Sequence, residues 1–136
     1  MAKLVLKNTF VKINGVDLSD WASSCELSLE VDDQDATTFG SGGWSEFLGG
    51  LKSGSLSITF KQDFAAGAVD ETLWPLFGTL VPFAVRATSD PASATNPEYR
   101  GTVLVNGHSP VAGDVGAIAE SEVEWTTSGA ITRATA

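Results

Sequence analysis

Residues 25–31 read CELSLEV, a stretch in which apolar and polar side chains alternate without a break. Successive side chains of a β-strand point to opposite faces of a sheet, so this pattern predicts a strand with one apolar and one polar face. The apolar phase carries four residues, which we expect to face a core: Cys25, Leu27, Leu29 and Val31. The polar phase carries two glutamates and a serine, which we expect to face water: Glu26, Ser28 and Glu30.

The same period of two recurs in four later parts of the chain: residues 55–61, 83–87, 99–105 and 115–125. Near the start of the chain, Asn14-Gly15 separates two short apolar-rich runs, which is the usual sequence of a tight β-hairpin turn. At 136 residues the chain fits one domain and leaves little room for a second. The sequence therefore predicts a single sheet-rich domain over residues 1–136.

Residues 69–78, VDETLWPLFG, depart from the strand rhythm. Leu73, Trp74 and Phe77 have helical spacing, acidic residues stand at the start of the segment and a glycine at its end. Pro75 would clash with the preceding turn of a regular helix, so we predict a short or kinked helix of about two to three turns. We expect Leu73 and Phe77 to cover an open end or face of the sheet.

Residues 32–50, DDQDATTFGSGGWSEFLGG, predict a long loop that is rich in glycine and carries large apolar side chains. A loop of this length is unusual in a compact domain and is often functional or disordered. Exposed aromatic residues reduce solubility unless they find a partner surface. Two interpretations follow: the loop folds back over its own domain, or it becomes ordered against a neighbouring subunit. The residues that would make either contact are Phe39, Trp44, Phe47 and Leu48.

The chain is poor in residues that carry out chemistry, with one His, one Cys and one Tyr. His108 follows Asn106-Gly107, a predicted turn, so we expect a surface histidine. Cys25 stands in the apolar phase of a strand and is expected to be a buried small hydrophobic residue, not a reactive thiol. No nucleophile motif, zinc motif or phosphate-binding glycine loop is present. We expect no enzyme activity, no cofactor and no metal site.

The net charge is −9, from 17 acidic and 8 basic residues. The Lys and Arg residues are scattered along the sequence, whereas a nucleic-acid-binding protein needs them clustered to neutralise phosphates. Direct binding of nucleic acid is therefore not expected. The first ten residues, MAKLVLKNTF, lack the pattern of a signal peptide, and no stretch approaches the roughly 20 apolar residues of a membrane span. We expect no association with a membrane.

Asp32, Asp33 and Asp35 form an acidic cluster that we considered as a calcium site. An EF-hand loop that began at Asp32 would need a glycine at Thr37 and a glutamate at Gly43, so the spacing does not fit. We interpret the cluster as a solvated acidic turn.

Glu120, Glu122 and Glu124 share the polar face of one predicted strand, where like charges repel one another and must stay hydrated. This row is either a plain solvent face or a surface that lines an aqueous channel or pairs with basic residues of a neighbour. Glu26 and Glu30, on the polar face of another predicted strand, can join the same surface.

The order of short motifs along the chain resembles that of the major tail tube proteins of long-tailed phages, in particular the small ones of actinobacterial siphophages. The likeness spans nearly the whole chain and rests on the order of elements more than on any one match. The motifs are INGVDLSDW at 13–21, TFG at 38–40, KQD at 61–63, the short helix at 69–78, VPFAVR at 81–86 and TNPEYRG at 95–101.

This resemblance implies two packed antiparallel sheets, as a sandwich or partly open barrel, with one short flanking helix and a long inter-strand loop. It implies hexameric rings that stack into a tube, with residues 1–9 as a terminal arm and residues 32–50 reaching the next ring. DNA would pass through the lumen without specific binding, and we expect an acidic lumen lined by Glu26, Glu30, Glu120, Glu122 and Glu124. The inter-ring contacts would be made by Phe39, Trp44, Phe47 and Leu48.

The same resemblance implies a structural protein of the virion tail that is assembled in the host cytoplasm. Its partners would be further copies of itself, the tape measure protein, the tail terminator, and baseplate or distal tail proteins. One alternative is a neck or tail-terminator subunit, which forms one ring without polymerising. Another is a β-sandwich that binds a small ligand or carbohydrate through tryptophans, although Trp74 and Trp125 have core-like phase. The candidates for that platform are Trp21, Trp44, Trp74 and Trp125.

Overall fold

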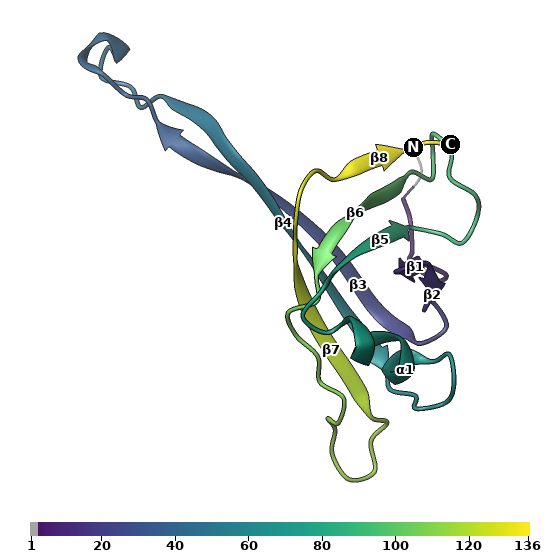
Figure 1. Cartoon of the computed structure of the whole chain (residues 1–136). Helices are drawn as coiled ribbons and strands as arrows, with labels where there is room; N and C mark the ends of the chain where they lie inside the picture. Colours follow the sequence, from purple (N-terminus) through teal and green to yellow (C-terminus); the bar gives the residue numbers. More distant parts are fainter. Residues whose placement is uncertain (1–2) are drawn as a thin grey trace.

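The computed structural model describes residues 3–136, and in this part of the chain eight strands accompany one α-helix and two 3-10 turns (Figure 1). Within the same residues no helix is long and apolar enough to cross a membrane. In chain order the elements are β1 Phe10–Ile13, β2 Val16–Asp17, β3 Ala22–Asp35, η1 Phe39–Ser41, β4 Phe47–Lys61, α1 Val69–Leu73, η2 Trp74–Leu76, β5 Leu80–Arg86, β6 Glu98–Leu104, β7 Glu120–Thr127 and β8 Thr132–Ala134.

These strands form one antiparallel sheet in the order β2-β1-β5-β6-β7-β4-β3, with β8 beside β6. The sheet is open, because β2 and β3 at its two ends do not pair with each other. Its halves, β1–β5–β6 and β3–β4–β7, are joined by a short β6–β7 pairing and contribute to one core. The predicted mainly β fold with one short flanking helix is confirmed, and its two packed sheets are the halves of this continuous open sheet.

The core lies between the two halves of the sheet. Trp125 is fully buried there, and its indole N–H donates a 2.8 Å hydrogen bond to the Gly107 carbonyl, so that its one polar group is satisfied. Each large apolar side chain buried in this way contributes about 1.5–3 kcal/mol to the free energy of unfolding. The β4 and β7 core residues are Leu56, Ile58, Phe60, Val123 and Trp125, and the facing half contributes Val11, Ile13, Val81, Phe83, Val85 and Val103.

The hairpin at Asn14-Gly15 forms as predicted. Both residues have positive φ, 50° and 82°, which is what a type I′ turn requires, and the flanking Ile13 and Val16 pair across it. Before this hairpin, the described residues 3–9 of the expected terminal arm have no regular secondary structure. Residues 1 and 2 of that arm lie outside the described part of the chain.

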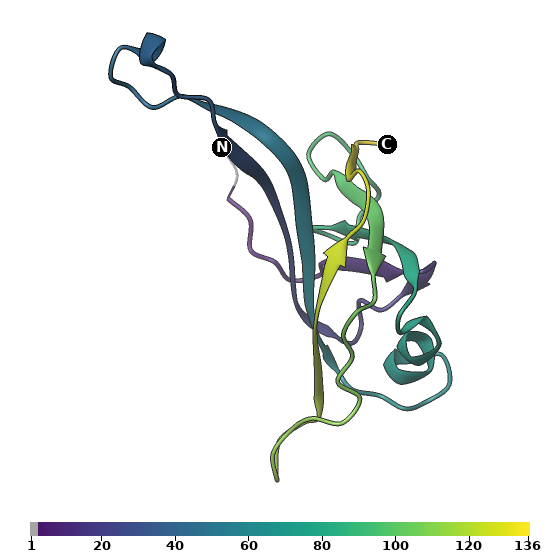
Figure 2. The same cartoon turned by 60° about the vertical axis from the view of Figure 1, so that its left-hand side comes forward.

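The β3–β4 hairpin extends far beyond the rest of the molecule, as both views show (Figures 1 and 2). Residues 32–35 and 47–50, predicted as loop, are strand, so the connection is shorter than expected and carries the η1 turn. The outer part of the strand predicted at 25–31 also leaves the core: Leu29 and Val31 are 54% and 51% exposed. The physical reason is that β3 continues past the core, so its apolar phase loses the layer that would cover it. We call residues 29–53 the arm.

The helical segment breaks at the predicted place. Regular α-helix ends at Leu73, and Trp74-Pro75-Leu76 continue as a 3-10 turn with the proline near its start, where its missing N–H costs nothing. Leu73 is buried, but Phe77 and Trp74 are 51% and 62% exposed, so the prediction that Phe77 covers the sheet is wrong. After the kink, these two rings point out of the core, and Trp74 lies beside the buried His108 ring.

The strand predicted over residues 115–125 begins only at Glu120. Residues 115–119 belong to a loop, where Val115 is fully exposed and Ile118 is 68% exposed. The alternation of apolar residues continues into this loop, but β4 ends at Lys61, the partner of Glu120, so there is no strand to pair with the earlier residues. The pattern was correct for the part of the segment that has a neighbour.

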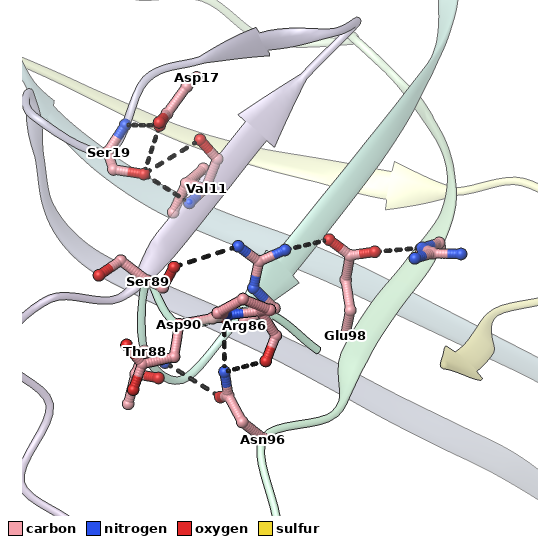
Figure 3. A network of polar contacts seen from close by, with 11 residues as sticks. Val11, Asp17, Ser19, Arg86, Thr88, Ser89, Asp90, Asn96 and Glu98 are labelled. Atoms are coloured by element: carbon pink, nitrogen blue, oxygen red, sulfur yellow. Dashed lines mark hydrogen bonds and ion pairs between the residues drawn. The ribbon is translucent and has the colours of Figure 1, made fainter. Parts of the chain in front are cut away.

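A polar network fixes the start of β6 against β5 (Figure 3). The Arg86 guanidinium donates to Glu98 at 2.7 Å and lies 3.9 Å from the centre of the Phe10 ring, and Arg100 donates to the other oxygen of Glu98. Asn96, which is buried, donates to the Asp90 carbonyl and accepts from the Thr88 N–H. Burial alone would raise the pKa of Glu98, but Arg100 and Arg86 together outweigh it and hold that pKa below its usual range.

We predict that Glu98→Gln lowers the free energy of unfolding by about 2–3 kcal/mol at neutral pH, because the two arginines lose charge-assisted hydrogen bonds. Because the pKa of Glu98 is lower in the folded than in the unfolded chain, its stabilising contribution is complete above the unfolded pKa of about 4.3. That contribution is lost as the pH falls through the folded-state pKa. The deficit of the variant should therefore shrink on acidification. Urea unfolding from pH 7 to pH 3 measures it, with the exposed Glu122→Gln as the control, and a deficit that stays constant with pH would contradict the assignment.

Candidate functional site

The five predicted lumen residues lie on one face of the β3–β4–β7 half-sheet, the face turned away from the core. The strand register places Glu26 beside Ser57 and Ser57 beside Glu124, so the first and last of these share a row across three strands. Farther from the arm, Thr59 of β4 pairs with Glu122 of β7. Closer to the arm, Glu30 of β3 pairs with Ser53 of β4. The structure thus brings together residues that are almost a hundred positions apart in sequence. We call this surface, Glu26, Glu30, Glu120, Glu122 and Glu124, the acidic face.

Small hydroxyl residues of β4 separate the glutamates of β3 from those of β7. Neighbouring strands are about 4.8 Å apart, so carboxylates on β3 and β7 are about 10 Å from each other, close to the screening length at physiological ionic strength. Repulsion within the sheet is therefore modest, and the charges still add up to one negative surface. Glu120 is the exception, because it pairs with Lys61 at the end of β4.

A hollow of about 680 Å³ lies beside the acidic face, between Glu120, Glu122 and Glu124 and the loop before β7. The β7 side of the hollow carries the three glutamates, and the loop side carries small residues together with Asp114 and Ile118. In the described part of the chain, no group of three or more His, Cys, Asp or Glu side chains is placed to hold a metal ion. Of the acidic cluster on the arm, Asp35 accepts a hydrogen bond from the Thr37 N–H at 2.9 Å, and this bond lowers the pKa of Asp35.

The tip of the arm presents the apolar residues that the sequence singled out, and none of them contacts the core. The arm points away from the body, so the interpretation in which residues 32–50 fold back over their own domain is wrong (Figure 2). Two of the side chains belong to the connection and two to the start of β4. Their exposed fractions are Phe39 109%, Trp44 79%, Phe47 56% and Leu48 66%. Whether they contact another subunit remains a prediction.

His108 is not the surface residue that its turn sequence predicted. Its side chain is only 2% exposed, and it lies 6.4 Å from the Trp74 ring and 3.7 Å from an Asp70 carboxylate oxygen. Neither ring nitrogen has a hydrogen-bond partner among the described residues. The cause is tertiary: α1 and η2 pack over the segment after β6, and a turn sequence contains no information about what covers it.

The basic residues are less scattered in space than in sequence. On the outer face of β1–β5–β6, the register places Lys12, Ala84 and Arg100 in one row and Phe10, Arg86 and Glu98 in the next. Both arginines bind Glu98, so the two rows together carry a net charge of +2, from Lys12, Arg86 and Arg100 against Glu98. The two halves of the sheet therefore differ in charge, with the strongly acidic face on the opposite side of the core.

The four tryptophans form no common binding platform. Trp125 is in the core, Trp44 is at the arm tip and Trp74 is exposed on η2, contrary to its predicted core position. Trp21 donates its indole N–H to Asp63 at 2.9 Å. The carbohydrate-binding alternative depended on these rings sharing a surface, and the fold separates them.

Comparison with known proteins gives a fold but no sequence family. No protein-family model and no curated protein matches this sequence. Eleven chains of solved structures share the fold. One comes from the virion of a native gene transfer agent (GTA) particle, with a TM-score of 0.77 and 20% identity over 96% of this chain and 98% of that chain. Another comes from the tail of an empty GTA particle with C6 symmetry, with a TM-score of 0.67 and 22% identity over 83% and 81%.

Cys25 packs against the core from β3, as its phase predicted, and burial raises the pKa of its thiol to about 11. At pH 8 roughly one molecule in a thousand would carry the thiolate, which is the reactive form. We predict that a disulfide reagent modifies Cys25 at least about 100-fold more slowly in the folded protein than in urea. Absorbance of the released thiol chromophore measures the rates. Equal rates in the two states would show that β3 opens readily or that the thiol is exposed.

Proposed function

We propose that this chain is the structural building block of a tail tube, in which six copies form a ring and rings stack into a hollow tube. Support comes from the fold it shares with a chain of a C6-symmetric tail. Within the proposal, the protein has no catalytic activity and belongs to the virion tail, after assembly in the host cytoplasm. The order of sequence motifs adds the finer proposal of a long-tailed phage of an actinobacterial host.

The observation that carries this proposal is the arm. It is held out from the body by a fourteen-residue and a fifteen-residue strand, and it ends in exposed aromatic side chains. A solitary soluble protein gains nothing from such a feature, since exposed apolar surface favours aggregation. In an assembly that repeats along an axis, the same arm would bury its tip against the next layer.

The open edge of β3 supports a ring. Strand edges with free N–H and C=O groups invite pairing with another chain, and closing a sheet around a barrel removes them. β3 is the last strand of the sheet, and all of its ladder partners lie on the β4 side. In a closed ring, each β3 edge would meet a different surface of the next copy, which is the head-to-tail contact that generates cyclic symmetry.

The acidic face would line the lumen. If the β3–β4–β7 half-sheets stood side by side around the axis, their glutamates would form repeated rings of negative charge. Phosphates would be repelled from such a wall, so DNA would pass through it without sticking. The tape measure protein, the tail terminator and baseplate or distal tail proteins are the further partners of this proposal.

Replacement of the arm-tip rings tests the stacking. We predict that Phe39→Ala combined with Trp44→Ala leaves the thermal midpoint within about 2 °C, because both side chains are exposed, and abolishes tubes in negative-stain electron micrographs. The partly exposed Val16→Ala, away from the arm, is the control and should assemble like wild type. Tubes of normal length from the double variant would refute the role of the arm tip. Isolated rings from the wild-type chain would favour a neck or terminator subunit instead.

Charge reversal tests the lumen. We predict that tubes of Glu122→Lys combined with Glu124→Lys retain duplex DNA at low salt and release it as salt rises, whereas wild-type tubes do not bind it. The control is Asp90→Lys, on the exposed loop between β5 and β6, which should not retain DNA inside the tube. A reconstruction of wild-type tubes that places these glutamates at buried subunit contacts would reject the acidic lumen while leaving the tube itself intact.

A further inference from the structure

Exposed large apolar side chains gather at two opposite ends of the described molecule. One group belongs to the arm, and the other surrounds α1 and the loop before β7, at the end of the body away from the arm (Figure 1). Apart from Val16, Val111 and residues 4–6, every exposed large apolar side chain of the described residues belongs to one of these two groups. We call the second group the end patch: Phe64, Trp74, Phe77, Leu80, Val115 and Ile118.

The end patch stands on a fixed support. The Gly78 N–H donates to the Val105 carbonyl at 2.7 Å, and the Gln62 side chain donates to the Pro110 carbonyl at 2.8 Å, which ties the segments of the patch together. Beneath them, Leu73 and the His108 side chain are buried. Trp74 and Phe77 stack with their ring centres 6.4 Å apart. The surface is therefore held in place by hydrogen bonds, while the Trp74 and Phe77 side chains stay more than half exposed.

Charge distribution restricts what can meet the arm tip. Residues 36–45 contain no charged side chain, although the chain as a whole carries −9. Residues 72–83, which supply Trp74, Phe77 and Leu80 of the end patch, also contain none. Residues 109–119 contain only Asp114, and Phe64 follows Asp63. If the tip lay on the acidic face, it would bury carboxylates without partners, which is costly. Trp74, Phe77 and Leu80 offer the tip an apolar surface on an uncharged segment, and only Ile118, at the border of the patch, lines the hollow beside Glu120 and Glu122.

We propose that the end patch of one copy is the docking site for the arm tip of a second copy in the adjacent ring. This inference rests on the proposed function and adds the receiving surface to it. The tip projects away from its own body and cannot reach its own end patch. Because tip and patch lie at opposite ends, the contact is head-to-tail and repeats without closing, which gives a stack in which every ring points the same way.

Disulfide trapping tests the contact directly. In a Cys25→Ser background, Ser45→Cys places a thiol beside Trp44, and Thr79→Cys places one between Phe77 and Leu80, without removing any apolar side chain of either surface. On oxidation, assembled tubes should give a ladder of covalent dimers, trimers and higher species on non-reducing gels. The control pair, Ser45→Cys with Asp90→Cys, should give at least tenfold less.

Each outcome separates the two proposals. Tubes that form normally but give no ladder, or the same ladder in both pairs, overturn the docking site and leave the tail tube standing. If wild-type chains form neither rings nor tubes, the proposed function fails, and the inference fails with it.

Complementary variants provide a second test that does not depend on oxidation. Trp74→Ser with Phe77→Ser damages the patch and keeps the tip, whereas Phe39→Ser with Trp44→Ser damages the tip and keeps the patch. All four side chains are exposed, so each variant should fold, which circular dichroism checks. Separately assembled rings of either variant should not stack, and a mixture should give pairs of rings and nothing longer. Tubes from the patch variant alone would overturn the proposal.

Discussion

The pairing of β4 with β3 on one side and β7 on the other is the interaction on which the rest of the structure depends. It aligns Leu27, Leu56 and Trp125 in one row on the core side, and Glu26, Ser57 and Glu124 in the next row on the outer side. A slip of one residue would exchange the two faces and bury the carboxylates, so the register is strongly specified. One ladder thus fixes the core and the acidic face at once.

The arm is a continuation of this same ladder beyond the core that stabilises it. Past Leu29 the β3–β4 pairs have no covering layer, and their backbone hydrogen bonds alone hold the strands out from the body. The exposed apolar side chains at the tip reduce solubility unless another apolar surface covers them. At the other end of the body, the kink at Pro75 turns Trp74 and Phe77 outward. The molecule therefore leaves two apolar surfaces uncovered, too far apart to cover each other.

Charge is distributed with the same separation. The acidic face carries most of its glutamates without basic neighbours, whereas Glu98 on the other half of the sheet is enclosed by Arg86 and Arg100. Glu98 belongs to the stability of the monomer. The carboxylates of the acidic face lie on the outer side of their half-sheet, where water hydrates them, and under the proposed function the same surface lines the lumen.

The sequence by itself determined which residues share a strand face, the Asn14-Gly15 turn, the break of the helix at Pro75 and the core-facing phase of Cys25, because each depends on local backbone geometry. Polar phase also allowed Glu26 and Glu124 to share a surface, but the pairing of β4 with both β3 and β7 is what placed them on one face. Only the tertiary structure decided where a face is covered. Alternation continues through Leu29, Val31 and Val115, yet no layer of the protein covers them. His108 is buried, and not exposed as predicted, because α1 packs across it. Phase is a property of neighbours in the chain, but burial is a property of neighbours in space.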